Sequence, residues 1–129
     1  MQGFMGNLPG VRFVVTWMLR QVGVYPAVFY GVVAQSGSGY AAGNTTAFQT
    51  LWTTVATAGG GLIVLQAGFI ALNATTLNHA LGGAATVSIQ GAGGSTILYF
   101  HGVTGPFLNI ATASGSAVNY GFIRDFQLR

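Results

Sequence analysis

The chain has 129 residues, enough for one domain with a modest core. Only 4% of them are charged: four arginines, no lysine and one acidic residue, Asp125, which leaves a net charge of +3. Soluble domains average roughly 25% charged residues, so we infer that much of this surface meets another chain, a lipid or a larger assembly. The arginines form no basic run, which argues against nucleic-acid binding, and the absence of cysteine excludes disulfides and thiolate metal sites.

Residues 1–34 are apolar and punctuated by glycine and proline, and we interpret them as an N-terminal anchoring or assembly segment. The stretch 13–33 is apolar enough for a membrane-spanning helix to be considered. Arg20 lies near its middle, however, and a central arginine costs about 2.5–3.5 kcal/mol on insertion scales. A membrane partner is therefore disfavoured, and we expect Phe13–Val15 and Ala27–Val33 to be buried strands or a subunit contact.

Residues 35–44 are predicted to be a Gly/Ser linker to an amphipathic helix over Thr46–Ala58. Thr46 and Gln49 have the spacing of a capping box, in which both side chains satisfy amides of the first helical turn. One face of this helix is apolar, with residues at i, i+3, i+4 and i+7, and we expect it to be buried as the cap of the fold. Its members are Phe48, Leu51, Trp52 and Val55.

Short apolar strands are predicted after the glycines that end this helix. They are Leu62–Gln66, Phe69–Leu72, Thr86–Gln90, Thr96–Phe100, Phe107–Ile110 and Phe122–Leu128. Aligning Leu62–Leu65 with Val87–Gln90 and Phe107–Ile110 gives a repeat of roughly 20–25 residues, the length of a solenoid coil. The sequence therefore predicts a mainly β protein in which residues 45–129 form a capping helix and the coils of a short parallel β-helix.

The ordered set of motifs resembles the pectate-lyase-like right-handed parallel β-helix family, in particular bacteriophage tailspikes. It consists of Thr46–Gln49, Ala58–Ile70, Val87–Gly93, Thr96–Leu98 and Ile123–Phe126, preceded by Tyr30–Ala34, which is similar to the family's short strand before its helix. The resemblance implies a homotrimer on a virion, in the tail or baseplate and extracellular when assembled, and a role toward cell-surface polysaccharide in full-length relatives. The chain departs from the family in lacking the acidic pair before the helix, where it has Gly43–Thr46, and in lacking the long run of coils.

Catalytic chemistry has little support in the sequence. Glycoside hydrolysis usually takes two carboxylates, and Asp125 beside Arg124 is expected to form a surface ion pair instead. His79 and His101 lie in predicted turns without a third ligand, so we predict no metal and no cofactor, and the balance is against an enzyme. Gly91–Thr96 departs from the nucleotide-binding fingerprints and precedes a strand, which predicts a turn.

Aromatic side chains on the last strands are the candidates for contact with a glycan or a neighbouring subunit: Tyr99, Tyr120, Phe122 and Phe126. The leading hypothesis is a non-catalytic structural subunit of a phage tail or baseplate, which assembles with itself and with other virion tail proteins through apolar surfaces. The first alternative is a polysaccharide-binding or depolymerising tailspike module. The second is a membrane-associated or filament-forming protein that uses its N-terminal apolar stretch.

Overall fold

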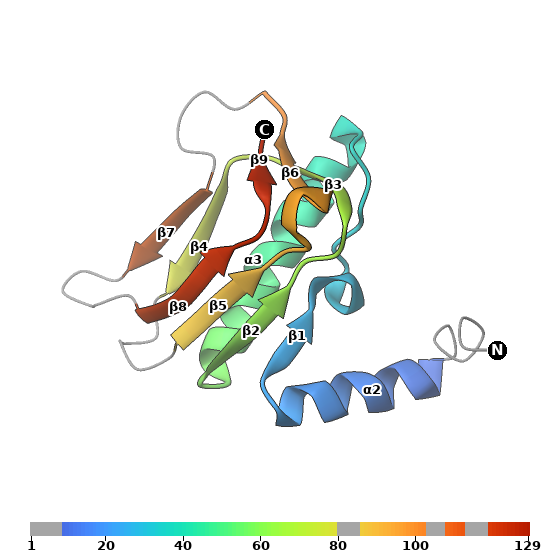
Figure 1. Ribbon diagram of the computed structural model, residues 1–129, viewed down its shortest axis with the longest axis vertical. Helices are drawn as coiled ribbons and strands as arrows, with labels where there is room; N and C mark the ends of the chain where they lie inside the picture. Colours follow the sequence, from blue (N-terminus) through green and yellow to red (C-terminus); the bar gives the residue numbers. More distant parts are fainter. Residues whose placement is uncertain (1–8, 80–85, 103–107, 113–118) are drawn as a thin grey trace.

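A computed structural model describes residues 9–79, 86–102, 108–112 and 119–129 (Figure 1). The protein is a mixture of helix and strand, 38% helical and 36% strand, with short parallel sheets. The prediction of a mainly β protein with a single helix is therefore wrong in its proportions. The described residues contain two α-helices, α2 (Pro9–Gln21) and α3 (Ala41–Thr57), and three 3-10 turns, η1 (Ala27–Tyr30), η2 (Ser38–Tyr40) and η3 (Gly93–Ser95).

Nine short strands form three parallel sheets in the described residues. The first sheet has the order β1-β2-β5-β8, the second β3-β6-β9 and the third β4-β7. The strands are β1 (Val24–Pro26), β2 (Gly60–Val64), β3 (Gly68–Leu72), β4 (Thr75–His79), β5 (Thr86–Gln90), β6 (Thr96–Phe100), β7 (Leu108–Thr112), β8 (Asn119–Arg124) and β9 (Gln127–Leu128). Successive strands β2, β3 and β4 lie in different sheets, and β5, β6 and β7 pair with them in the same order.

Helix α3 packs against β2, β3 and β4, one strand from each sheet, and Figure 1 shows it running behind the strands. The apolar face recognised in the sequence is the side that it buries, since Phe48, Leu51, Trp52 and Val55 are all at most 1% exposed. These side chains and the inward residues of the sheets form one hydrophobic core. Burial of this face, more than the intrinsic propensity of a threonine-rich helix, stabilises α3.

The start of α3 differs from the prediction. The helix begins at Ala41, five residues before Thr46, and Tyr40 at its N-cap makes no side-chain capping bond. The second half of the predicted linker 35–44 is therefore helical. Two of its early polar side chains bond to distant backbone instead of capping: Asn44 contacts Val33 and Ala71, and Thr45 Oγ1 accepts from the Asn73 amide at 2.9 Å.

The N-terminal residues also depart from expectation. Phe13–Val15 lie in helix α2 and not in a buried strand, and Ala27–Val33 hold a 3-10 turn followed by irregular chain. The strand expected over Tyr30–Ala34 is likewise absent, and the short strand before the helix is β1, where Pro26 occupies an edge, as proline in a sheet usually does. Proline at the first position of α2 suits a helix N-terminus because its missing amide would have no intrahelical partner.

The predicted repeat contains two errors, one in the register of a strand pair and one in the choice of partner strand. Leu62 pairs with Ser88, so β2 and β5 are offset by 26 residues and not the 25 of the alignment with Val87. Strand β7 pairs with β4, a strand that was not predicted, at an offset of 33 residues between Thr75 and Leu108. The single strand expected over Phe122–Leu128 is two, β8 and β9, separated by a bend, and Phe107 lies outside the described residues.

Candidate functional site

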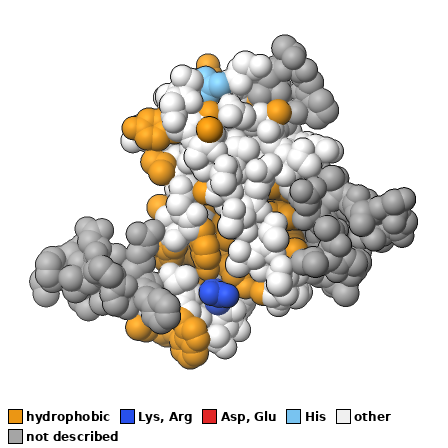
Figure 2. All heavy atoms as spheres, turned by 180° about the vertical axis from the view of Figure 1, so that it is seen from behind, with side chains coloured by type: hydrophobic (Ala, Val, Ile, Leu, Met, Phe, Trp, Pro, Cys, Tyr) orange, Lys and Arg blue, Asp and Glu red, His pale blue; other side chains and the backbone are white. Residues whose placement is uncertain are grey.

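A shallow groove of about 580 Å³ lies between the end of α2 and the outer face of α3. The described residues that line it are mostly polar in type, but the surface that they expose to the groove is mostly apolar, and Arg20 is the one charged side chain among them. The remaining lining residues all come from α3 and the residue that follows it: Gln49, Thr50, Thr53, Thr54, Thr57 and Ala58. Figure 2 views the molecule from behind the sheets, and the described surface there is mostly uncharged polar side chains and backbone with separate hydrophobic clusters.

Much of the hydrogen-bonding capacity of this groove is already used within the protein. Thr53 Oγ1 donates to the Gln49 carbonyl at 3.1 Å and Thr54 Oγ1 to the Thr50 carbonyl at 2.9 Å, which is a common local bond of threonine in helices. Gln49 Nε2 donates to the carbonyl of Thr76 in β4 at 2.9 Å. None of the described lining residues carries a carboxylate or an imidazole, the groups that usually activate a nucleophile.

Tyr30 lies near Arg20 and has an unusual environment. Its hydroxyl is buried and makes no hydrogen bond to any described residue. Burial raises the pKa of Tyr30 above its ordinary value of 10.0, and the positive charge of Arg20 opposes part of that rise. Tyr30 is therefore a neutral phenol at physiological pH, and its role here is packing beside Tyr25, whose ring centroid lies 6.0 Å away.

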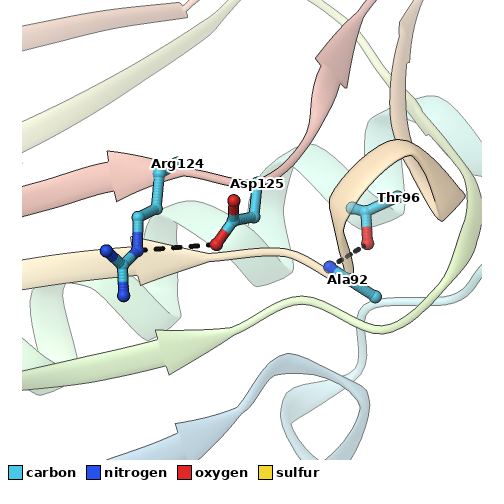
Figure 3. Close-up of polar contacts among 4 residues, drawn as sticks. All are labelled: Ala92, Thr96, Arg124 and Asp125. Carbon is cyan, nitrogen blue, oxygen red and sulfur yellow. Dashed lines mark hydrogen bonds and ion pairs between the residues drawn. The ribbon is translucent and has the colours of Figure 1, made fainter.

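Asp125 is placed where sequence reasoning put it, in an exposed ion pair. Its Oδ2 lies 3.5 Å from Arg124 Nε, and both side chains are about half exposed (Figure 3). The Arg124 guanidinium also lies 4.2 Å from the centroid of the Phe122 ring. Asp125 occupies the bend between β8 and β9 with φ of 64°, a conformation that aspartate tolerates better than most residues. Exposed pairs of this kind contribute little to stability.

The glycine-rich segment before β6 is a turn, as predicted. It contains η3, and the Ala92 amide donates to Thr96 Oγ1 at 2.7 Å, as Figure 3 shows. Thr96 Oγ1 in turn donates to the Gln66 carbonyl at 3.0 Å. The Ala92 amide is thus already bound by a side chain of the protein, which leaves it unavailable to cradle a phosphate.

The histidines do not form a metal site in the described residues, where no three His, Cys, Asp or Glu side chains gather. His101 Nε2 lies 2.6 Å from the Ser36 carbonyl, and its ring centroid is 4.7 Å from that of Tyr99. The backbone of His79 belongs to β4, paired with Thr112 of β7, so this residue is in a strand and not in the predicted turn. Its side chain lies outside the described part of the chain.

The three candidate aromatic residues whose side chains are described lie on different parts of the fold. Tyr99 is exposed, and its ring centroid lies 6.4 Å from that of Phe69 on the neighbouring strand β3. Phe122 is half-buried under Arg124, and Phe126 is half-buried against the core. The side chain of Tyr120 lies outside the described residues.

Two residues that the sequence did not single out complete the surroundings of Tyr99: Phe69 and Arg129. The Arg129 guanidinium lies 5.9 Å from the Phe69 ring centroid, and the backbone of Arg129 is held by β6, since its amide donates to Leu98 and its carbonyl accepts from Phe100. We call Phe69, Tyr99, His101 and Arg129 the aromatic cluster. Neighbouring side chains of a strand point to opposite faces of the sheet, and Ile70, next to Phe69, is buried. This alternation in β3 and β6 is the only signal in the sequence that could have indicated an exposed Phe69.

Comparison with known proteins adds no assignment: no protein-family model, characterised protein or solved structure matches this chain. Among the described residues, no helix is both long enough and apolar enough to span a bilayer.

Proposed function

We propose that the chain is a short right-handed parallel β-helix capped by α3, and that it serves as a non-catalytic structural subunit of a phage tail or baseplate, assembled as a homotrimer. The observation that carries the proposal is the order of pairing. Strands β2, β3 and β4 enter three sheets in turn, and β5, β6 and β7 follow them through the same sheets in parallel register. A chain that winds in successive coils produces this order, and sequential hairpins do not.

The packing of α3 supports the cap in this proposal. A solenoid leaves its terminal coil with an exposed core, which a polar-backed helix can cover. Helix α3 contacts one strand of each sheet with its apolar face and presents threonines on its outer face. The coil lengths of 26 to 34 residues from β2 onward are uneven, which is consistent with loops inserted between the faces of a coil.

A structural role, as opposed to a catalytic one, is supported by the chemistry of the chain. Its one acidic side chain is an exposed ion-pair partner of Arg124. The placement on a virion is based on the motif resemblance, and the trimer on that resemblance together with a surface of very low charge.

The proposal is tested in two steps. Size-exclusion chromatography with light scattering should give three times the chain mass of 13.3 kDa, and antibodies against the protein should label the tails of particles purified from the source strain. A soluble monomer would contradict the trimer, and unlabelled particles would contradict the virion assignment. A high-resolution structure with antiparallel hairpins in place of the three parallel sheets would refute the proposed β-helix.

A second candidate, a polysaccharide-binding module, is favoured by the aromatic cluster. Exposed rings stack on the apolar faces of sugars, and an arginine near them can bind a carboxylate of an acidic glycan. Titration with capsular and lipopolysaccharide glycans should detect binding that Tyr99→Ala abolishes and that Tyr40→Ala, a similarly exposed tyrosine on η2, leaves unchanged. An absence of binding across the panel would eliminate this candidate.

A further inference from the structure

Helix α2 stands apart from the rest of the described protein. Its main contacts are with β1, and Figure 1 shows it projecting away from the sheets. A helix of 13 residues is about 20 Å long and is marginal in water without packing. Several of its residues are β-branched valines, which further lowers the helix propensity. The helical state of α2 therefore depends on a surface that the described part of the chain does not supply.

The exposed side chains of α2 are mostly apolar. Five large hydrophobic residues of the helix and the turn that follows it are 37–73% exposed: Val14, Val15, Trp17, Met18 and Val22. Solitary exposed hydrophobic residues are ordinary, but a contiguous group of this size marks an interaction surface. We call these five residues the α2 apolar face.

The angular distribution of this face indicates how many neighbours it has. At 100° per residue, Trp17, Val14, Met18 and Val15 cover an arc of about 160°, interrupted only by Gln21. Thr16 and Arg20 lie on the opposite side of the helix. A helix in a two-stranded pair buries a narrow stripe, whereas a helix with two neighbours buries two adjoining flanks. The wide arc therefore fits a cluster of three helices better than a pair.

The area of this face sets an upper limit on the surface that association through α2 can bury. With the exposed fractions above, the five side chains present on the order of 500 Å² per copy, or about 1,500 Å² over three copies. Stable protein interfaces bury about 1,200–2,000 Å² in total. In a trimer this area of about 1,500 Å² is divided among three pairwise contacts of about 500 Å² each, and a contact between two copies would bury at most about 1,000 Å², so the wide arc and not the area selects three copies.

We propose that α2 is the trimerisation element: three copies of this chain pack their α2 apolar faces together in a parallel three-helix cluster, with Thr16 and Arg20 pointing outward. The proposal deepens the proposed function and rests on its trimer. Parallel helices follow from threefold symmetry, since each copy is related to the next by a rotation about one axis. The exposed Arg20 of each copy stays in water, so the cluster does not bury this charge.

The test compares two variants of the full chain with equal numbers of introduced glutamines. Val14→Gln/Met18→Gln places polar groups in the α2 apolar face, and Thr16→Gln/Arg20→Gln changes the opposite side. Light scattering over a concentration series should show the first variant as a monomer, with association weakened at least about 100-fold, and the second as a trimer like the wild type. Circular dichroism reports whether the strands and α3 remain folded in both.

Each outcome is decisive for the role of α2. A trimer that survives Val14→Gln/Met18→Gln would refute α2 as the contact and leave the proposed trimeric function intact. A monomeric wild type would overturn both. Flotation with vesicles of phosphatidylcholine and phosphatidylglycerol addresses the competing partner: a monomeric wild type that floats, with flotation lost in the apolar-face variant, would assign α2 to a lipid surface instead.

Discussion

Asn44 is a buried polar residue that makes three hydrogen bonds to distant backbone, and its replacement tests the described packing. The residue is 2% exposed in the first turn of α3. Its Oδ1 accepts from the Val33 amide at 2.8 Å, and its Nδ2 donates to the carbonyls of Val33 at 2.9 Å and Ala71 at 3.0 Å. One side chain thus joins α3 to the segment that precedes it and to strand β3.

The expected cost of Asn44→Ala follows from the surroundings of each partner. The Ala71 carbonyl belongs to a fully buried residue, and leaving it without this donor costs about 1–3 kcal/mol. Val33 is 43% exposed, so water can replace the amide at its two groups, and each loses only a net hydrogen bond of about 0.5–1.5 kcal/mol. We therefore expect the free energy of unfolding to fall by about 4 kcal/mol.

Asn44→Asp should be worse than Asn44→Ala at neutral pH. The aspartate retains the acceptor for the Val33 amide, but its second oxygen faces two carbonyl oxygens to which asparagine donates. Burial and these carbonyls both raise the pKa of the introduced carboxyl above its unfolded value of about 3.9. Because the pKa of this carboxyl is higher in the folded than in the unfolded protein, its contribution to stability is complete below the unfolded pKa and is lost as pH rises through the folded pKa. Acid should therefore stabilise Asn44→Asp relative to wild type.

Urea unfolding followed by tryptophan fluorescence measures these differences, because Trp52 is in the core. Unfolding of the wild type at each pH corrects for other titrating groups, of which Asp125 is the only side-chain carboxylate. Asn109→Ala, at an exposed asparagine of β7, is the matched control and should change stability by less than about 0.5 kcal/mol. An Asn44→Ala protein as stable as this control, or an Asn44→Asp protein with no pH dependence relative to wild type, would refute the assigned hydrogen bonds.

Three further predictions concern packing, backbone and titration. Trp52→Ala should destabilise the protein by about 3–5 kcal/mol in urea unfolding, since the side chain is fully buried. Gly60→Ala should lower the free energy of unfolding by at least about 3 kcal/mol, because φ is +107° and a Cβ there would collide with the backbone of β5. Gly59→Ala is the control: φ is +97° but the position faces open space, so the cost should be about 1–2 kcal/mol. Because the pKa of Tyr30 is raised in the folded protein, its contribution to the free energy of unfolding is complete below pH 10.0 and is lost as pH rises through the folded pKa. Tyr30→Phe should remove this loss of stability at high pH. Arg20→Gln should raise the pKa of Tyr30 further, as measured by ultraviolet titration.

Local patterns predicted those elements whose side chains report their own burial. The apolar face of α3 was correct because its four residues are large and recur at helical spacing, and β5 and β6 were correct to the residue because short apolar runs lie between turn signals. Strand β4, Thr75–His79, was missed because its one aliphatic side chain is Leu77 and its pairing with β7 is distant in sequence. The early start of α3 was missed because Asn44 and Thr45 bond to partners 11 to 28 residues away.

The candidate sites show the same division. The exposed pairing of Asp125 with Arg124 was predictable because the residues are adjacent, and the scarcity of acidic groups follows from composition. The α2 helix was not predicted, since valines next to Pro9 and Gly10 score poorly for helix, and neither its exposure nor the groove beside Arg20 is visible in a linear pattern. The exposure of α2 and the groove both depend on how helices and strands pack against one another, which a single sequence specifies only weakly.

The offset of 26 residues between β2 and β5 shows why a one-residue error matters in a stacked structure. In the observed register Tyr25, Ile63, Ile89 and Ile123 are successive partners across β1, β2, β5 and β8. The first three are at most 2% exposed and Ile123 packs against the same core, so they form an inward ladder through the whole sheet. The alignment of Leu62 with Val87 would instead place Ile63 beside Ser88, and side chains alternate between faces along a strand. The buried apolar ladder would then be replaced by pairs of one apolar and one polar side chain. Burial of apolar side chains, and not the apparent repeat length, therefore selects the register.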